Sequence, residues 1–185
     1  MANSLEEFRR DPKTFLRTTP VSIRCLPRDT FGTRQGAHYY RWDNSDPTNR
    51  VRITPLKSCP IGQIFRAYTV PVTEQSDFQM GTVPSVNPVT DILVTTSLNA
   101  CSFVWRYGDT GINVGHAKPT KDGFELQRSL SNQYGYGSVY GKSDFLRRGE
   151  AATVIGVFDW NEAKWHIYAQ VYCADGRPVK VDVLL

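Results

Sequence analysis

From residue 21 onward, hydrophobic and polar positions alternate over short runs, which is the pattern of half-buried β-strands. The clearest runs are the last three, at 151–159, 164–173 and 178–184, where β-branched and aromatic residues predominate. Turn residues separate them, so these runs predict an antiparallel meander. The full set of predicted strands is 21–26, 37–42, 50–54, 63–72, 91–97, 101–107, 111–117, 151–159, 164–173 and 178–184.

Helical signals are confined to two places. Ser4 followed by Glu7 forms a capping-box pattern that predicts a helix over 4–10, and after Pro12 a further turn is predicted, so the helical segment spans about 4–17. A second short helix is predicted at 124–130. The Tyr- and Gly-rich residues 132–141 are interpreted as a surface connection, or alternatively as a mobile lid. The pattern as a whole predicts an α+β fold, mainly antiparallel β with a few short helices.

Composition narrows the class of protein. With 185 residues, 40% hydrophobic and 22% charged, the chain is expected to form a single globular domain over 1–185. Its net charge of +4 comes from scattered basic residues, so no nucleic-acid partner is expected. No stretch reaches the length of a membrane span, and the N-terminus lacks the apolar core of a cleavable signal peptide.

Cysteine and histidine spacings argue against a metal centre. The four cysteines show no CxxC pair and the three histidines no HxxH pair, so neither a metal nor a cofactor is expected. The cysteines are read as free thiols, of which Cys25, Cys59 and Cys173 are interpreted as small buried hydrophobes.

The most informative feature is a predicted hairpin that contains a cysteine and a histidine. Two β-prone runs flank the dipeptide Gly108-Asp109, which suits a two-residue turn. In that register Cys101 lies directly opposite His116, with Cβ atoms about 4.5–5.5 Å apart. One face of the hairpin is then largely apolar and carries Cys101, Phe103, Trp105, Ile112, Val114 and His116.

A rival turn would separate the pair. If the turn were the three residues 109–111, Cys101 would face Pro119 and His116 would face Val104. In the first register, the imidazole can take the thiol proton and make Cys101 a nucleophile, while backbone N–H groups near the Asn99-Ala100 step can point at an oxyanion. The alternative reading is a buried structural cysteine beside an unrelated histidine.

Four positions in this region resemble bacterial protein-glutamine deamidases, which include the catalytic domain of cytotoxic necrotizing factor and the chemoreceptor deamidases. Thr95, Leu98, Cys101 and His116 have the spacing that recurs in that superfamily, and Pro119 follows the histidine as in the chemoreceptor enzymes. The chain departs from the necrotizing-factor pattern directly before the nucleophile, where Ser-Gly is replaced by Asn99-Ala100.

The resemblance implies a deamidase-toxin-like β-sandwich with helices packed on it. It implies that Cys101 attacks a glutamine or asparagine side chain of a target protein, that His116 transfers the protons, and that a thioester is hydrolysed. Thr95 would orient His116, and a backbone carbonyl with that role in the necrotizing factors would fall near 68–70. No cofactor or metal is implied.

The resemblance also suggests partners and location. Relatives are mostly toxins or effectors, so we expect a virulence protein made in the bacterial cytoplasm and secreted or injected, with a secretion chaperone or machinery as a partner. The target would be a host regulator such as a small GTPase. Alternatives that remain open are a transglutaminase, thiol protease or acyltransferase using the same pair, and a non-catalytic β-sandwich that binds a protein or glycan.

Overall fold

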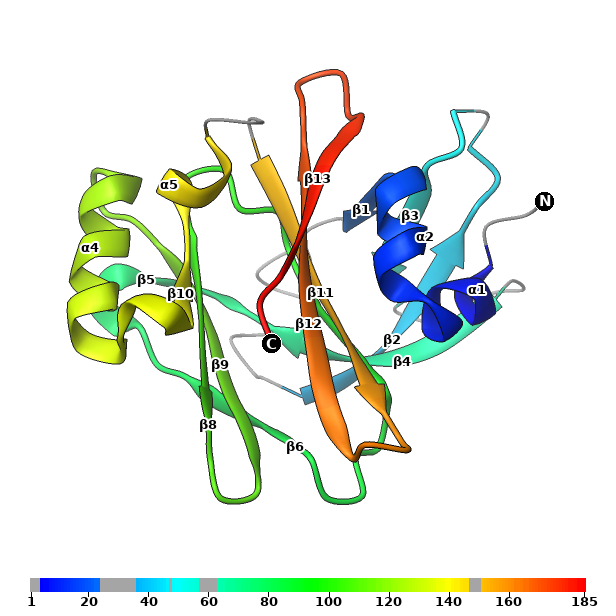
Figure 1. Cartoon of the computed structure of the whole chain (residues 1–185), viewed down its shortest axis with the longest axis horizontal. Coiled ribbons are helices and arrows are strands. Elements are labelled where there is room, and N and C mark those ends of the chain that lie inside the picture. Colours follow the sequence, from blue (N-terminus) through cyan, green and yellow to red (C-terminus); the bar gives the residue numbers. More distant parts are fainter. Residues whose placement is uncertain (1–3, 24–35, 47, 57–62, 147–150) are drawn as a thin grey trace.

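Two facing β-sheets form the centre of the molecule, with helices on both outer sides (Figure 1). The computed structural model describes residues 4–23, 36–46, 48–56, 63–146 and 151–185. From one side to the other, the layers are the N-terminal helices, an eight-stranded sheet, a five-stranded sheet and one long helix. The predicted fold class, α+β and mainly antiparallel β-sandwich, is confirmed.

The eight-stranded sheet contains most of the predicted strands and the whole C-terminal meander. Its neighbours run antiparallel except for the pairs β1–β3 and β4–β7, which are parallel. In spatial order it comprises β1 (Val21–Ile23), β3 (Val51–Pro55), β2 (Gly36–Asp43), β4 (Gln63–Val70), β7 (Ile92–Thr95), β11 (Ala151–Asp159), β12 (Lys164–Tyr172) and β13 (Pro178–Val183).

The five-stranded sheet is built around the predicted hairpin. Its strands are β10 (Val139–Tyr140), β8 (Ser102–Tyr107), β9 (Gly111–Lys118), β5 (Val72–Glu74) and β6 (Gly81–Pro84). The first half of β9 pairs with β6, and its second half pairs in parallel with β5. The short strands β6 and β10 have no counterpart in the sequence prediction.

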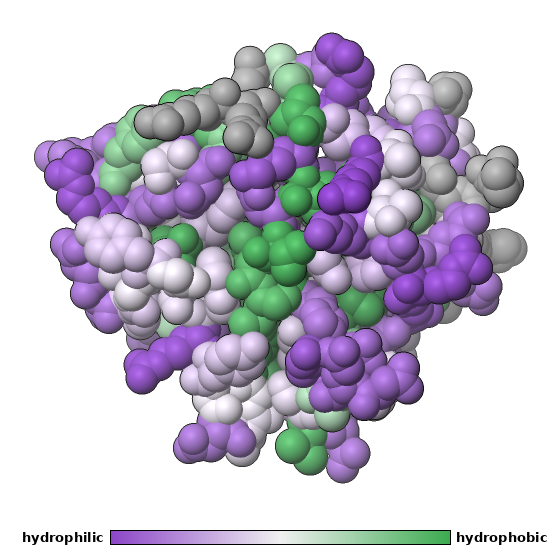
Figure 2. Space-filling model, viewed as in Figure 1, coloured by the Kyte–Doolittle hydropathy of each residue, from purple (hydrophilic) through white to green (hydrophobic). Residues whose placement is uncertain are grey.

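A shared apolar core holds the two sheets together. Phe103, Trp105 and Val114 project from the smaller sheet, and Leu93 and Ile167 project from the larger one. Removal of these side chains from water is the main term that favours this packing. At the open edge between β13 and β10 this core reaches the surface, where Figure 2 shows a stripe of apolar side chains over β13.

The N-terminal helices fill the outer side of the larger sheet. α1 (Leu5–Arg10) begins with the predicted capping box, and α2 (Pro12–Thr18) follows directly. Phe8 and Phe15 pack around Trp42 of β2. The sheet curls around them, so that β1 and β12 come together: the side chain of Gln170 in β12 accepts a hydrogen bond of 2.8 Å from the backbone N–H of Val21 in β1.

On the far side, α4 (Gly123–Tyr134) covers the smaller sheet. Leu126 and Leu130 pack against Val104 and Val139. The helix is longer than the predicted 124–130. The Tyr- and Gly-rich residues after it form a 3-10 turn η2 (Tyr136–Ser138) and then β10, whose two residues are buried, so the stretch as a whole is not a loop or lid as predicted. The remaining short elements are the 3-10 turn η1 (Gln75–Asp77) and α5 (Lys142–Phe145).

Candidate functional site

The hairpin forms, but its register corrects the prediction for Cys101 and His116. Phe103 lies opposite His116 and Tyr107 opposite Ile112, so the turn is centred on Asp109-Thr110 and closed by a 2.8 Å bond from the N–H of Gly108 to the carbonyl of Gly111. Both predicted turns are therefore wrong. Continuing this register places Cys101 beside Lys118, and not directly opposite His116.

Close packing by β6 explains the shift. A Cβ atom on Gly111 would lie 2.1 Å from the carbonyl oxygen of Val83, so only glycine lets β6 approach this point of the backbone. Gly111 is thereby part of the strand, and the two residues before it form the turn. Neither glycine lies in the turn itself: Gly108 and Gly111 flank it, and the contact with β6 keeps Gly111 in the strand.

The predicted apolar face is preserved, because the register differs by two residues and side chains alternate with a period of two. Phe103, Trp105, Ile112 and Val114 all lie in the core between the sheets, and Cys101 packs against that core. His116 and Cys101 thus belong to the same face as diagonal neighbours, for which a separation of about 7–8 Å between Cα atoms is typical.

The structure brings His116 and Thr95 into contact. Nδ1 of His116 lies 2.7 Å from the hydroxyl oxygen of Thr95, at the end of β7 in the opposite sheet. The same hydroxyl donates a 2.9 Å hydrogen bond to the carbonyl of Val70 in β4. A carbonyl only accepts, so the single hydroxyl proton points to Val70 and the Thr95 oxygen accepts from Nδ1–H. The imidazole proton is therefore on Nδ1, and Nε2 carries a lone pair.

This Nε2 atom is in an unusual position. His116 is fully buried, and within the described residues Nε2 has no hydrogen-bond partner. Buried polar atoms are nearly always paired, so each exception needs an explanation, of which a catalytic role is one; Ser102 Oγ and Thr153 Oγ1 share this property among the described residues. Cys101 does not hydrogen-bond to Nε2, so the thiol and the base are arranged on one face without being joined.

Burial determines the charge state of both groups. It lowers the pKa of His116 to about 3, because the imidazolium would lose its hydration. It also raises the pKa of the half-buried Cys101 thiol, an effect that the backbone N–H groups of Ala100 and Asn99 and the charge of Lys118 partly offset. The resting pair is a neutral thiol and a neutral imidazole.

The low pKa of His116 predicts a specific loss of stability in acid. Between the unfolded value of 6.5 and the folded value of about 3, the unfolded chain binds a proton that the folded chain does not. This contribution is full above pH 6.5 and is lost as the pH falls, at about 1.4 kcal/mol per pH unit for one proton. The measurement is the free energy of urea unfolding at several pH values between 6 and 4. In His116→Gln, the slope of this free energy against pH should be smaller than in the wild type by the amount that corresponds to about one proton.

The partly exposed His166 gives the matched control for that experiment. His166→Gln removes a partly exposed histidine instead of the buried one, so comparison of the two variants separates loss of the buried ring from loss of any histidine. An unchanged slope in His116→Gln would mean that the buried ring is not the group responsible.

The segment that leads to Cys101 is held from both sides. Leu98 exchanges two backbone hydrogen bonds with Ala152 of β11, at 2.7 and 3.1 Å. On the other side, Gly123 at the start of α4 packs so closely that a Cβ there would lie 2.3 Å from the carbonyl oxygen of Ala100. The N–H groups of Asn99 and Ala100 lie close enough to the Cys101 thiol to help lower its pKa against the effect of burial. Fixed N–H donors of this kind can stabilise an oxyanion.

The other cysteines carry less information. Cys173 is a free, half-buried thiol directly after β12, whereas a small buried hydrophobe is predicted there. Cys25 and Cys59 lie outside the described residues.

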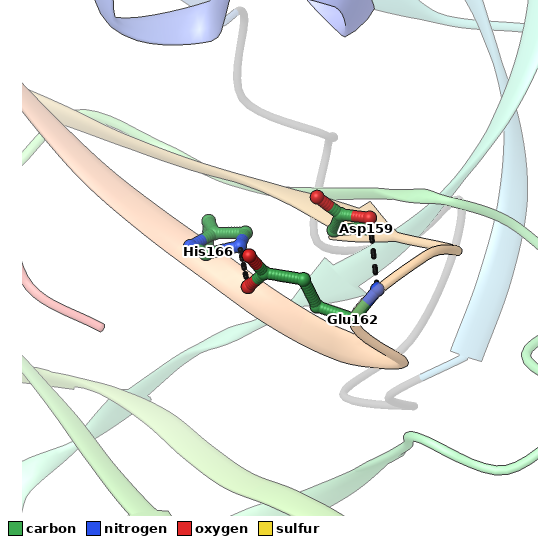
Figure 3. Close-up of side chains that lie close together, drawn as sticks. All are labelled: Asp159, Glu162 and His166. Carbon is green, nitrogen blue, oxygen red and sulfur yellow. Dashed lines mark hydrogen bonds and ion pairs between the residues drawn. The ribbon is translucent and has the colours of Figure 1, made fainter.

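One cluster of potential metal ligands was not anticipated from spacing. Asp159, Glu162 and His166 meet at the turn between β11 and β12 (Figure 3), with ligand atoms within 4.8 Å of one another. Their atoms already have partners. Asp159 accepts hydrogen bonds from the backbone N–H groups of Asn161 and Glu162, and Glu162 pairs with the ammonium of Lys164 at 2.5 Å as well as with His166 at 3.4 Å. We assign this cluster to stabilisation of the hairpin.

Comparison with known proteins adds no assignment. No protein-family model matches this chain, and no curated protein matches its sequence. Among the described residues, no helix is both long and apolar enough to cross a membrane. The functional argument therefore rests on the geometry around His116 and on the resemblance at Thr95, Leu98, Cys101 and His116.

Proposed function

We propose that this protein is a cysteine-dependent deamidase that converts a glutamine or asparagine side chain of a target protein into the corresponding acid. The observation that supports this most is the chain of contacts from the Val70 carbonyl through Thr95 to Nδ1 of His116. It fixes the tautomer whose free Nε2 can act as a base, on the face that also carries Cys101.

In the proposed reaction, the sulfur of Cys101 attacks the carboxamide carbon of the substrate while Nε2 of His116 takes the thiol proton. His116 then returns this proton to the amide nitrogen, the C–N bond breaks, and ammonia leaves. Water, deprotonated by His116, attacks the resulting thioester. The products are a carboxylic acid and the regenerated thiol, so that one water is consumed for each ammonia released.

The neutral resting pair fits a mechanism in which charge forms only during reaction. No thiolate–imidazolium pair is stored, because burial disfavours both charged forms. A substrate carboxamide between sulfur and ring would supply the missing partner of Nε2. The N–H groups of Asn99 and Ala100 would then stabilise charge on the substrate oxygen, in place of the Ser-Gly pattern of the necrotizing factors.

The biological setting follows from the resemblance alone. By that analogy the protein is a secreted or injected bacterial effector, and its substrate is a host protein such as a small GTPase.

The experiment is to incubate the purified protein with host-cell extract and map modified peptides by mass spectrometry. We expect a defined Gln or Asn residue to gain about one dalton, with no gain when Cys101 is replaced by alanine. Cleaved peptide bonds would instead indicate a thiol protease, and attached amines a transglutaminase. An extract that is equally unmodified by wild type and Cys101→Ala would favour the binding module.

A further inference from the structure

A hollow of about 460 Å³ opens beside the candidate site, at the end of the larger sheet where β12 turns toward β13. Its lining includes Asn99 and Arg50, which directly precedes β3. Tyr172, Cys173 and Gly176 complete most of the wall. Arg50 is the charged residue among the described residues that line this hollow.

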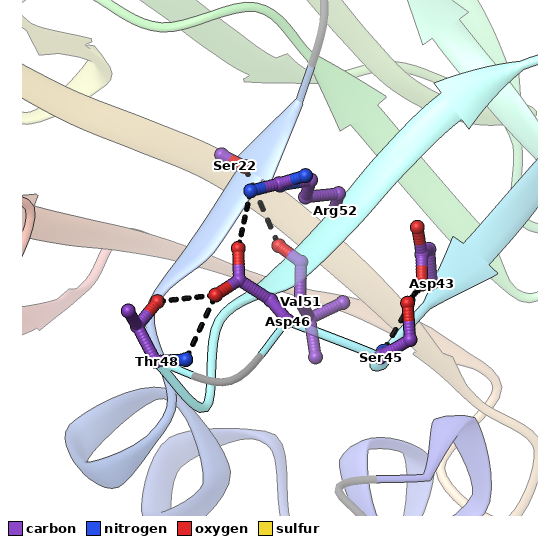
Figure 4. A network of polar contacts seen from close by, with 7 residues as sticks. All are labelled: Ser22, Asp43, Ser45, Asp46, Thr48, Val51 and Arg52. Carbon is purple, nitrogen blue, oxygen red and sulfur yellow. Dashed lines mark hydrogen bonds and ion pairs between the residues drawn. The ribbon is translucent and has the colours of Figure 1, made fainter.

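Among the residues that the structure describes, the charge of Arg50 acts only from a distance, where it adds to the effect of the Thr48 hydrogen bonds in lowering the pKa of Asp46. Within the described parts of the chain, Arg50 takes part in no hydrogen bond and no ion pair. Asp46, in the turn before it, is occupied by Thr48 and Arg52 (Figure 4). Asp175, near the hollow, pairs with Arg177 at 2.6 Å.

The turn after β12 is shaped around this guanidinium. Gly176 has a φ of +80°, and a Cβ atom there would lie 1.8 Å from Nη2 of Arg50. A side chain at this position would therefore both strain the backbone and displace the arginine. The guanidinium rests against bare backbone at the wall of the hollow.

The hollow and the thiol are connected by a short, fixed segment. Asn99 is two residues from Cys101, so their Cα atoms lie within about 7 Å of each other. The hydroxyl of Tyr172 in the hollow wall donates a 2.6 Å hydrogen bond to Ser97 in the same segment. A substrate chain that presents a carboxamide to Cys101 can thus place a neighbouring side chain in the hollow.

We propose that this hollow is a subsite for an acidic side chain of the protein substrate, next to the residue that is deamidated; this inference rests on the proposed function. An unpaired guanidinium favours a carboxylate, which it binds through two parallel N–H···O bonds. A phosphate group would call for several cations, and Arg50 is alone here among the described residues. The subsite therefore selects targets with Asp or Glu close to the modified Gln or Asn.

The test uses three chloroacetyl tripeptides, Gly-Glu-Gly, Gly-Gln-Gly and Gly-Lys-Gly, as probes of Cys101. The thiol sulfur displaces chloride from the probe and loses its proton, and peptide mapping distinguishes labelled Cys101 from Cys173. In the wild type, we expect the Glu probe to label Cys101 about tenfold faster than the Gln probe and the Lys probe to be slowest, since opposite charges attract at the subsite. In Arg50→Gln, the Glu and Gln probes should react equally.

The matched control is Arg177→Gln, which removes a nearby arginine that is already paired and should keep the preference. Gly176→Ala should reduce the preference through displacement of Arg50. A preference for Glu that persists in Arg50→Gln, or no preference in the wild type, would overturn the subsite. Alkylation of Cys101 by iodoacetamide, which has no charge, distinguishes failure of the subsite from failure of the proposed function. The alkylation rate should be the same in Arg50→Gln as in the wild type, whereas its dependence on His116 tests the proposed function.

Discussion

Replacement of His116 by glutamine is expected to lower the deamidation rate of a target protein by about 10²–10⁴, which is the usual contribution of a general base. The glutamine amide can still donate to Thr95, so the contact between the sheets is kept while the lone pair on Nε2 is lost. The effect is measured as the rate of ammonia release from a target protein identified by the mass-spectrometry experiment, compared between the wild type and the variant.

The control for this prediction is His166→Gln, at a partly exposed histidine of β12. Its rate should equal that of the wild type. If His116→Gln also retained the full rate, His116 would be a structural residue, and another group would have to move the proton.

Replacement of Thr95 by valine is expected to lower the same rate by about 10–10²-fold, the size of effect that a misplaced catalytic group produces. Valine has nearly the volume of threonine but has no hydroxyl. The Nδ1–H of His116 then loses its acceptor and the Val70 carbonyl loses its donor. The imidazole proton can then move from Nδ1 to Nε2, and a protonated Nε2 cannot act as a base.

Thr95→Ser keeps the hydroxyl and should retain most of the activity. If Thr95 had a purely structural role, its replacement by valine would lower the stability of the protein but leave the tautomer of His116 unchanged. Nitrogen NMR of His116 in the folded variants reports the tautomer and therefore separates the two roles. Thr95 acts through His116 and is a positioning residue. Equal activity of the valine and serine variants would contradict that role.

The strands could be predicted because their physical cause is local. In β11 and β12, β-branched and aromatic residues run between clear turn residues, and the bounds agree closely with the prediction. β10 has only two residues and β6 ends in proline, so neither gives a readable pattern. They exist because β8 and β9 offer them a partner, which is a tertiary effect.

The candidate site could be predicted only in part for the same reason. The shared face of Cys101 and His116 could be predicted because side chains alternate between the two faces of a strand. A shift of the register by two residues leaves each side chain on the same face. The register depends on the packing of β6 against Gly111. Because β6 is not part of the hairpin, the hairpin sequence alone could not predict this register. The depressed pKa of His116 arises from complete burial between two sheets, and Arg50 reaches the hollow from a distant part of the chain. Such effects require the folded arrangement.

The most direct test of the Cys101–His116 pair is the rate at which iodoacetamide alkylates Cys101 at pH 7. We predict that Cys101 reacts about tenfold faster in the wild type than in His116→Gln, because Nε2 accepts the thiol proton as the S–C bond forms. Equal rates in the two proteins, with Cys101 no more reactive than Cys173, would contradict the proposed catalytic pair.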